Sequence, residues 1–106
     1  MQTLTYQFPA NRVAPRAVHI GVVASGDLEI LLSPPASGEP SDSASVRVRT
    51  SVNGFDTVWR DVLERFFTRT TLAGRWELND FGATPGVVTL RLRQAAEAAT
   101  TKGPAS

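Results

Sequence analysis

One apolar stripe constrains the fold of this chain more than any other feature. Between residues 55 and 66, apolar side chains recur every three or four positions, which places them on one face of an α-helix. Asn53-Gly54 lies just before the stripe and suits an N-cap or a turn. We therefore expect an amphipathic helix with Trp59 as a core anchor. The stripe consists of Phe55, Val58, Trp59, Val62, Leu63 and Phe66.

Shorter segments alternate polar and apolar residues, as strands with one buried face do. Two of these runs flank Ser25-Gly26-Asp27, a turn signal, so that pair predicts a hairpin. Pro and Ser residues dominate 33–45, where we expect a long loop. The predicted strands are residues 3–8, 17–24, 28–32, 46–50 and 74–79.

The last element fits two patterns. Residues 88–93 alternate like a strand, whereas the apolar residues from Val88 to Ala99 also fit a helical stripe. Thr84-Pro85 is the N-cap and first-turn signature of a helix, so we predict a helix. This order of elements predicts an α+β fold, in which two helices pack on one face of a mainly antiparallel β-sheet.

The length of 106 residues favours a single domain. We assign residues 1–99 to this domain, with the Pro/Ser-rich loop at 33–45, and residues 100–106 to a flexible tail. The chain has no cysteine, a net charge of +1 and no long apolar run. This composition argues against disulfides, thiolate metal sites, nucleic-acid binding and membrane insertion. With no signal-peptide pattern at residues 1–10, we expect a cytoplasmic protein.

Catalytic constellations are hard to find in this sequence. His19 is the only histidine, and one histidine without cysteine does not make a typical zinc site. Ser25 lies six residues from His19 along an extended arm, which at about 3.3 Å per residue is too far for a hydrogen bond. The carboxylates are scattered. Arginines on strand and helix faces favour a solvated or protein-docking surface; they are Arg47, Arg49, Arg91 and Arg93.

Ser25-Gly26-Asp27 by itself predicts only a hairpin turn. A turn tip can also present a hydroxyl group on a rigid scaffold to a modifying enzyme. Three blocks around and beyond this turn closely resemble the acyl-carrier (delta) subunit of malonate decarboxylase, in the same order and over most of the chain. The blocks are Val22-Val23-Ala24-Ser25-Gly26-Asp27-Leu28-Glu29, Thr50-Ser51-Val52-Asn53-Gly54-Phe55 and Asn79-Asp80-Phe81-Gly82-Ala83-Thr84-Pro85-Gly86.

The resemblance implies a non-catalytic carrier subunit. It implies a phosphoribosyl-dephospho-CoA group on Ser25 that holds acetyl and malonyl thioesters, with Gly26 and Asp27 supporting the turn. The implied partners are the acyl transferase and decarboxylase subunits and the prosthetic-group transferase. Because a helix N-terminus favours anions, the second distinctive block is a candidate for contact with phosphate or a partner. Its candidate residues are Asn79, Asp80, Thr84 and Gly86.

Two alternatives stay open at this point. The carrier subunit of citrate lyase uses a similar arm on a serine, although the block from Asn79 to Gly86 favours the malonate system. A non-carrying interaction module, in which Ser25 is only a turn residue, is the alternative from another class. A small nucleic-acid-binding domain is a distant third, because the net charge is close to neutral.

Overall fold

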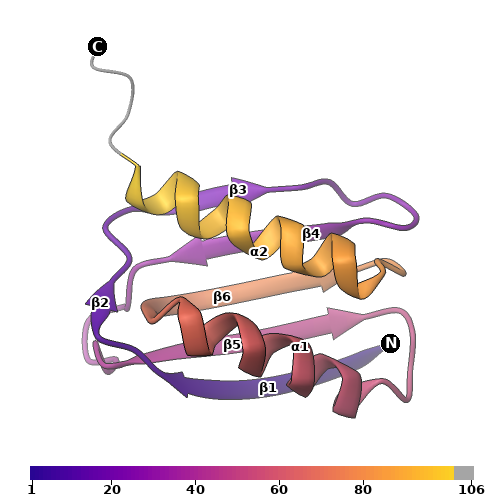
Figure 1. Cartoon of the computed structure of the whole chain (residues 1–106), viewed down its shortest axis with the longest axis horizontal. Helices are drawn as coiled ribbons and strands as arrows, with labels where there is room; N and C mark the ends of the chain where they lie inside the picture. The colour runs from indigo at the N-terminus through magenta and orange to yellow at the C-terminus, as the bar shows by residue number, and fades with distance from the viewer. Residues whose placement is uncertain (102–106) are drawn as a thin grey trace.

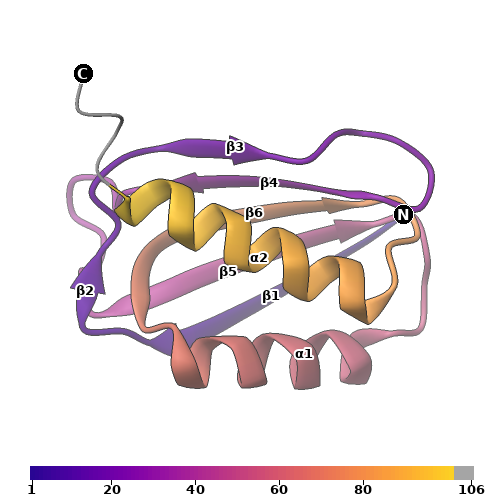
Figure 2. The ribbon, with the colours of Figure 1, turned by 45° about the horizontal axis from the view of Figure 1, so that its top comes forward.

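The computed structural model describes residues 1–101 and consists of a β-sheet covered by two helices on one face (Figure 1). The order of the elements along the chain is β1 (Gln2–Pro9), β2 (Arg12–Val13), β3 (Val18–Ile20), β4 (Leu28–Ser33), β5 (Ser43–Thr50), α1 (Asp56–Arg69), β6 (Leu72–Asp80) and α2 (Pro85–Thr100). Both views show α1 over the β1 side of the sheet and α2 over the β3 and β4 side (Figure 2). The predicted α+β class is confirmed.

The strand order is β1-β5-β6-β4-β3, and β2 pairs with the start of β6. Adjacent strands are antiparallel except for β5 with β6 and β2 with β6, which are parallel. Helix α1 connects the parallel neighbours β5 and β6, as a parallel pair requires a crossover and not a tight turn. The hairpin predicted around Ser25 forms between β3 and β4.

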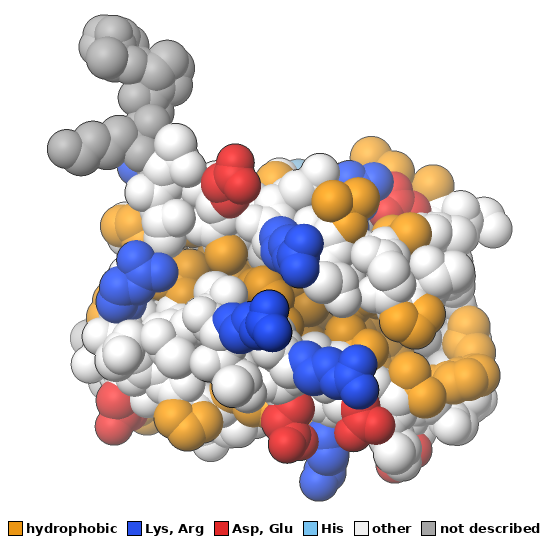
Figure 3. Space-filling view, in the orientation of Figure 1, with side chains coloured by type: hydrophobic (Ala, Val, Ile, Leu, Met, Phe, Trp, Pro, Cys, Tyr) orange, Lys and Arg blue, Asp and Glu red, His pale blue; other side chains and the backbone are white. Residues whose placement is uncertain are grey.

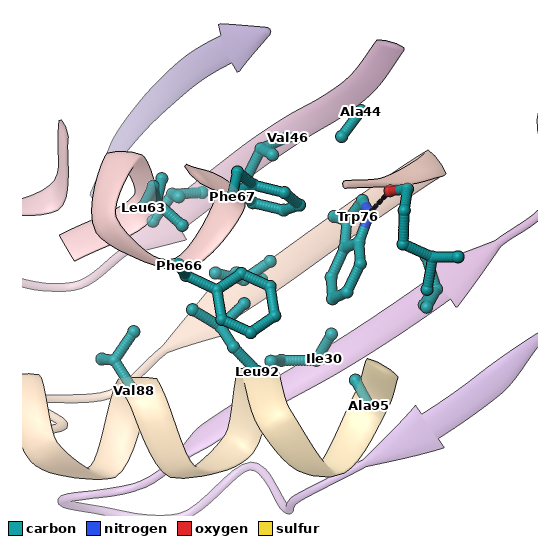
Figure 4. Close-up of a cluster of buried hydrophobic side chains, with 14 of the residues drawn as sticks. Ile30, Ala44, Val46, Leu63, Phe66, Phe67, Trp76, Val88, Leu92 and Ala95 are labelled. Carbon is teal, nitrogen blue, oxygen red and sulfur yellow. Dashed lines mark hydrogen bonds between the residues drawn. The ribbon is translucent and has the colours of Figure 1, made fainter. Parts of the chain in front are cut away.

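The core lies between the sheet and the helices (Figure 4). Trp76 of β6 is fully buried, and its ring makes edge-to-face contacts with Phe66 and Phe67 of α1. Its indole N–H donates to the Leu72 carbonyl at 3.2 Å, so the one polar atom of the side chain is satisfied. Leu92 and its neighbours on α2 close the other half of the core. The predicted apolar face of α2 is buried at Val88, Leu92, Ala95 and Ala99.

Several predicted boundaries are wrong. The first hairpin strand ends at Ile20 and not at Ala24, because Gly21 has a φ of 82° and turns the chain, which leaves Val22 and Val23 exposed. The predicted loop 33–45 is shorter, since β4 includes Ser33 and β5 begins at Ser43. Residues 12–13, which lie outside the predicted strands, form β2.

The helix ends also differ from the prediction. Phe55 and not Asn53 or Gly54 is the N-cap of α1, and Gly54 lies in a bend with a φ of 88°. Helix α2 continues to Thr100, so the predicted tail cannot begin there, and residues 102–106 of that tail lie outside the described residues. Neither helix in the described part of the chain has the length and apolar content that a membrane span requires.

Candidate functional site

Ser25 lies at the tip of the hairpin between β3 and β4, and its side chain is exposed. The Asp27 N–H donates to the Ala24 carbonyl at 3.0 Å, which closes a four-residue turn with Ser25 and Gly26 at its centre. Gly26 has a φ of 78°, and no non-glycine residue of the described chain has positive φ, so the turn is type II. Within residues 1–101 the Ser25 hydroxyl makes no hydrogen bond. The turn therefore presents a free hydroxyl group to solvent.

The connection between β6 and α2 holds this turn in place. The Gly26 N–H donates to the Phe81 carbonyl at 2.7 Å, and the Phe81 N–H donates to the Asp27 carbonyl at 3.1 Å. A side-chain carbon added at Gly82 would lie 4.0 Å from the Gly26 nitrogen. The two segments that the sequence singled out, around Ser25 and from Asn79 to Gly86, thus lie side by side at one end of the sheet (Figures 1 and 2).

Asp27 ties the turn to α2. Arg91 makes a bidentate contact with the Asp27 carboxylate. Its Nε donates to Oδ1 at 3.0 Å, and its Nη2 donates to Oδ2 at 3.0 Å. The Leu28 N–H also donates to this carboxylate, at 2.7 Å. The Arg91 guanidinium and then the Leu28 N–H hold the pKa of Asp27 below its usual value of 3.8. Arg91 is further oriented by Gln94, whose side-chain oxygen accepts from it at 2.9 Å.

Asp80 is buried, and its hydrogen bonds hold the connection between β6 and α2 in place. One carboxylate oxygen accepts from the Ala83 N–H at 2.9 Å, and the other accepts from the Thr50 hydroxyl at 2.8 Å. The Ser51 N–H donates to the Asp80 carbonyl at 3.2 Å, so the same residue also joins the end of β5. Asp80 is therefore a structural residue of this connection, and only 4% of it is exposed.

The start of α2 has the predicted cap. The Thr84 hydroxyl accepts from the Val87 N–H at 3.3 Å, and Pro85 occupies the first turn. Gly86, in the same turn, is exposed. Both helices begin at the end of the molecule that carries Ser25, because β5 and β6 both end there.

Not every predicted site residue joins this arrangement. Asn79 lies on the other face of β6, where its amide donates to Glu29 at 2.8 Å. The other oxygen of Glu29 is 2.9 Å from Nε2 of His19. His19 thus has Glu29 as its partner and not Ser25, in agreement with the prediction that Ser25 and His19 do not pair.

Sequence reasoning missed two parts of the site. Arg91 was expected on a solvated or protein-docking surface, whereas it pairs with Asp27, 64 positions away along the chain. A pocket of about 420 Å³ also opens between the first turns of α1 and α2, beside the connection that supports Ser25. The apolar stripe of α1 contains a signal for this pocket. Its first members, Phe55 and Val58, are 49% and 42% exposed and so are not covered by the core.

Comparisons with known proteins show the family to which the chain belongs. The family model of the malonate decarboxylase delta subunit (MdcD) matches residues 15–99. The chain belongs to this family. It is 48% identical over 100 residues to the malonate decarboxylase acyl carrier protein of Pseudomonas aeruginosa strain UCBPP-PA14, covering 93% of this chain and 97% of that one. Against the protein of the same name from Azotobacter vinelandii strain DJ, the identity is 46%, and 92% and 95% of the two chains are covered.

A solved structure extends the likeness to three dimensions. The chain is similar, with a TM-score of 0.84 and 44% identity, to a chain in the crystal structure of a Pseudomonas malonate decarboxylase hetero-tetramer in complex with malonate. The match covers 92% of this chain and 98% of that chain. Both the sheet and the helices that position Ser25 fall within a fold that the family shares.

Proposed function

We propose that this chain is the acyl-carrier subunit of a malonate decarboxylase and that Ser25 is the attachment point of its prosthetic group, phosphoribosyl-dephospho-CoA. The observation that carries the proposal is the Ser25 turn, an exposed hydroxyl on a loop fixed by Phe81 and Arg91. The names of the relatives and the similarity to a chain of the hetero-tetramer support the same function. We further propose a cytoplasmic location and contact with acyl transferase, decarboxylase and prosthetic-group transferase subunits.

The residues around Ser25 fit a bulky covalent group. A Cβ atom added at Gly26 would have no atom of the chain beyond the neighbouring residues within 4 Å, so the space on that side of the turn is open. When bound, the group supplies a terminal thiol that holds an acyl unit as a thioester. The chain's own contribution is to give this arm a fixed origin, because hydrogen bonds join Asp27 to α2 and join the turn to Phe81 in the connection between β6 and α2.

The chain does not need to activate Ser25 itself. His19 is held by Glu29, and the carboxylate two residues from Ser25 is committed to Arg91, so neither is placed as a base for the hydroxyl. We propose that a separate transferase catalyses the attachment and that other subunits catalyse acyl transfer and decarboxylation. Purified chain, alone and loaded, should then release no carbon dioxide from malonyl thioester. Release at a rate that follows the chain through successive purification steps would contradict a purely carrying role.

Intact mass tests the attachment. Protein from its native host should be heavier than the sequence by one phosphoribosyl-dephospho-CoA, and the modified peptide should contain Ser25. Ser25→Ala should remain folded and unmodified and should not support decarboxylation in the reconstituted complex. Ser51→Ala is the matched control, an exposed serine at the same end of the molecule that should stay fully modified. Full activity of a complex containing Ser25→Ala would favour a non-carrying interaction module.

A further inference from the structure

The pocket between α1 and α2 is apolar and lies next to the turn. Its volume of about 420 Å³ falls within the range of about 300–1,000 Å³ typical of small-molecule sites. Trp59, Val62 and Val88 form its inner wall, and Phe55 and Val58 form part of its exposed rim. Figure 3 shows hydrophobic side chains at the surface between the two helices and toward the end of the molecule that carries the turn.

Asp80 is the one ionisable residue among the described residues that line this pocket. Among the described residues that line it, polar side-chain atoms come only from Thr50, Asp80 and the indole N–H of Trp59, and no arginine, lysine or histidine lines it. The Asp80 carboxylate already accepts from Thr50 and from the Ala83 N–H. A neutral, apolar group would be accepted here without loss of a hydrogen bond. An anionic group would be desolvated beside Asp80 with no cation to offset the cost.

The position of the pocket connects it to Ser25. Gly82 lines the pocket and lies beside Gly26 in the turn, where a carbon added at Gly82 would be 4.0 Å from the Gly26 nitrogen. A long flexible chain that starts at Ser25 therefore has only the Gly82 segment to cross before it reaches the opening. No movement of the backbone is required for this path.

We propose, resting on the proposed function, that this pocket binds the acetyl thioester end of the arm on Ser25 and rejects the malonyl form. Loss of carbon dioxide from a malonyl thioester, with uptake of one proton at the carbon that carried it, gives an acetyl thioester, so a carboxylate in one form is replaced by a hydrogen in the other. The acetyl end is neutral and small enough to lie within a pocket of about 420 Å³ that Val58 and Trp59 help to line. The malonyl end would bring its carboxylate toward Asp80. The pocket thus shelters the thioester from water in one form and leaves the charged form free to reach a partner.

Two indole N–H signals in NMR spectra provide the test. Trp59 lines the pocket, whereas Trp76 is fully buried against Leu72 and serves as an internal control. Three samples of the loaded chain would be compared, each verified by mass. Their arms would end in a free thiol, an acetyl thioester and a malonyl thioester. Acetylation should shift the Trp59 signal and leave the Trp76 signal unchanged, and malonylation should leave both close to the free-thiol positions. Equal shifts for the two acyl forms, or none for acetyl, would overturn the inference.

Cleavage of the acetyl thioester by hydroxylamine gives a second readout. Sheltering one methyl-sized group should slow cleavage by about fourfold relative to an exposed thioester. Val58→Glu places a second carboxylate on the rim and should abolish this protection and the Trp59 shift. Leu90→Glu is the matched control on α2, because Leu90 is 50% exposed and does not line the pocket. Protection that survives in Val58→Glu would contradict the proposal.

The outcomes separate this inference from the proposed function. Absence of the added mass at Ser25 would overturn the carrier function and the inference together. A loaded, acetylated chain whose Trp59 signal does not move overturns only the inference. A Trp59 signal that responds to a catalytic subunit but not to acetylation would assign the pocket to a protein interface instead.

Discussion

The Asp27 side chain fixes the turn that carries Ser25, two residues before it. Its carboxylate is 17% exposed and is contacted by Arg91, which is 26% exposed, and by the Leu28 N–H. A contact that is partly screened by solvent adds little stability by itself. Its main effect is geometric, because it joins a hairpin tip to a helix that packs on the core.

The Asp27–Arg91 pair predicts a dependence of stability on pH. The pKa of Asp27 is below 3.8 in the folded chain and returns to about 3.8 on unfolding. A lowered carboxyl pKa stabilises the fold above the unfolded value, and this stabilisation is lost as the pH falls through the folded value. Arg91→Ala should therefore lower the free energy of unfolding at neutral pH, and its difference from the wild type should shrink below about pH 3.8.

Urea unfolding between neutral pH and about pH 2 measures this difference. Arg93→Ala is the control, since Arg93 is an exposed residue on the same helix and its loss changes the net charge equally. The Arg93→Ala curve should run parallel to that of the wild type. If Arg91→Ala also runs parallel over the whole range, the ion pair has no effect on stability in solution.

Local sequence signals predicted the position of Ser25 but not its support. Ser-Gly-Asp between two β-type runs is enough to predict an exposed turn, because Gly26 supplies the positive φ that the turn needs. The pairing of Asp27 with Arg91 depends on where α2 crosses the sheet, which no local pattern encodes. The grouping of Asn79 with Asp80 has a different cause, because it ignored that consecutive residues of a strand face opposite sides.

At the scale of elements, the turn between β3 and β4 is the part whose shape matters most. Gly26 has a φ of 78° and Gly38, in the loop before β5, has a φ of 87°. A Cβ atom added at either position would have no atom beyond the neighbouring residues within 4 Å. Both positions therefore carry the same conformational requirement without steric conflict, and only one of them adjoins Ser25.

Gly26→Ala and Gly38→Ala should destabilise the chain equally, each by about 1–2 kcal/mol, because alanine is strained in the left-handed region. Their effects on attachment should differ. Modification by the prosthetic-group transferase should slow strongly in Gly26→Ala and remain at the wild-type rate in Gly38→Ala. Mass spectrometry over time measures the rates, and thermal unfolding the stabilities. A Gly26→Ala chain modified at the wild-type rate would show that the turn geometry is irrelevant.

The elements themselves could be predicted to different degrees. The pattern of the last element fitted both a strand and a helix, and Thr84 and Pro85 decided for the helix α2, since caps are local signals. The stripe of α1 predicted the helix correctly but overstated its buried face, because Phe55 and Val58 project past the sheet. β2, with two residues, is too short to show periodicity, and its parallel pairing with β6 is set by the fold as a whole.

At the scale of the molecule, the two ends of the sheet differ. The Ser25 turn, the starts of both helices and the pocket share one end, because β5 and β6 run toward it in parallel. The loop at residues 34–42 lies at the opposite end, where β4 ends and β5 begins. It passes from one side of β6 to the other, and a turn within it is closed by the Glu39 N–H, which donates to the Ala36 carbonyl at 2.9 Å.

This polarity predicts that the loop tolerates insertion. Doubling its length with about nine Gly and Ser residues between Pro40 and Ser41 should cost about 0.6 kcal/mol, because closure entropy grows slowly with length. Both flanking residues are exposed, so no core contact is lost. The same insertion between Ala24 and Ser25 removes the hydrogen bond that closes the turn and should abolish most modification. Unfolding curves and intact mass compare the two chains. Equal loss of modification in both would show that the transferase contacts both ends of the sheet.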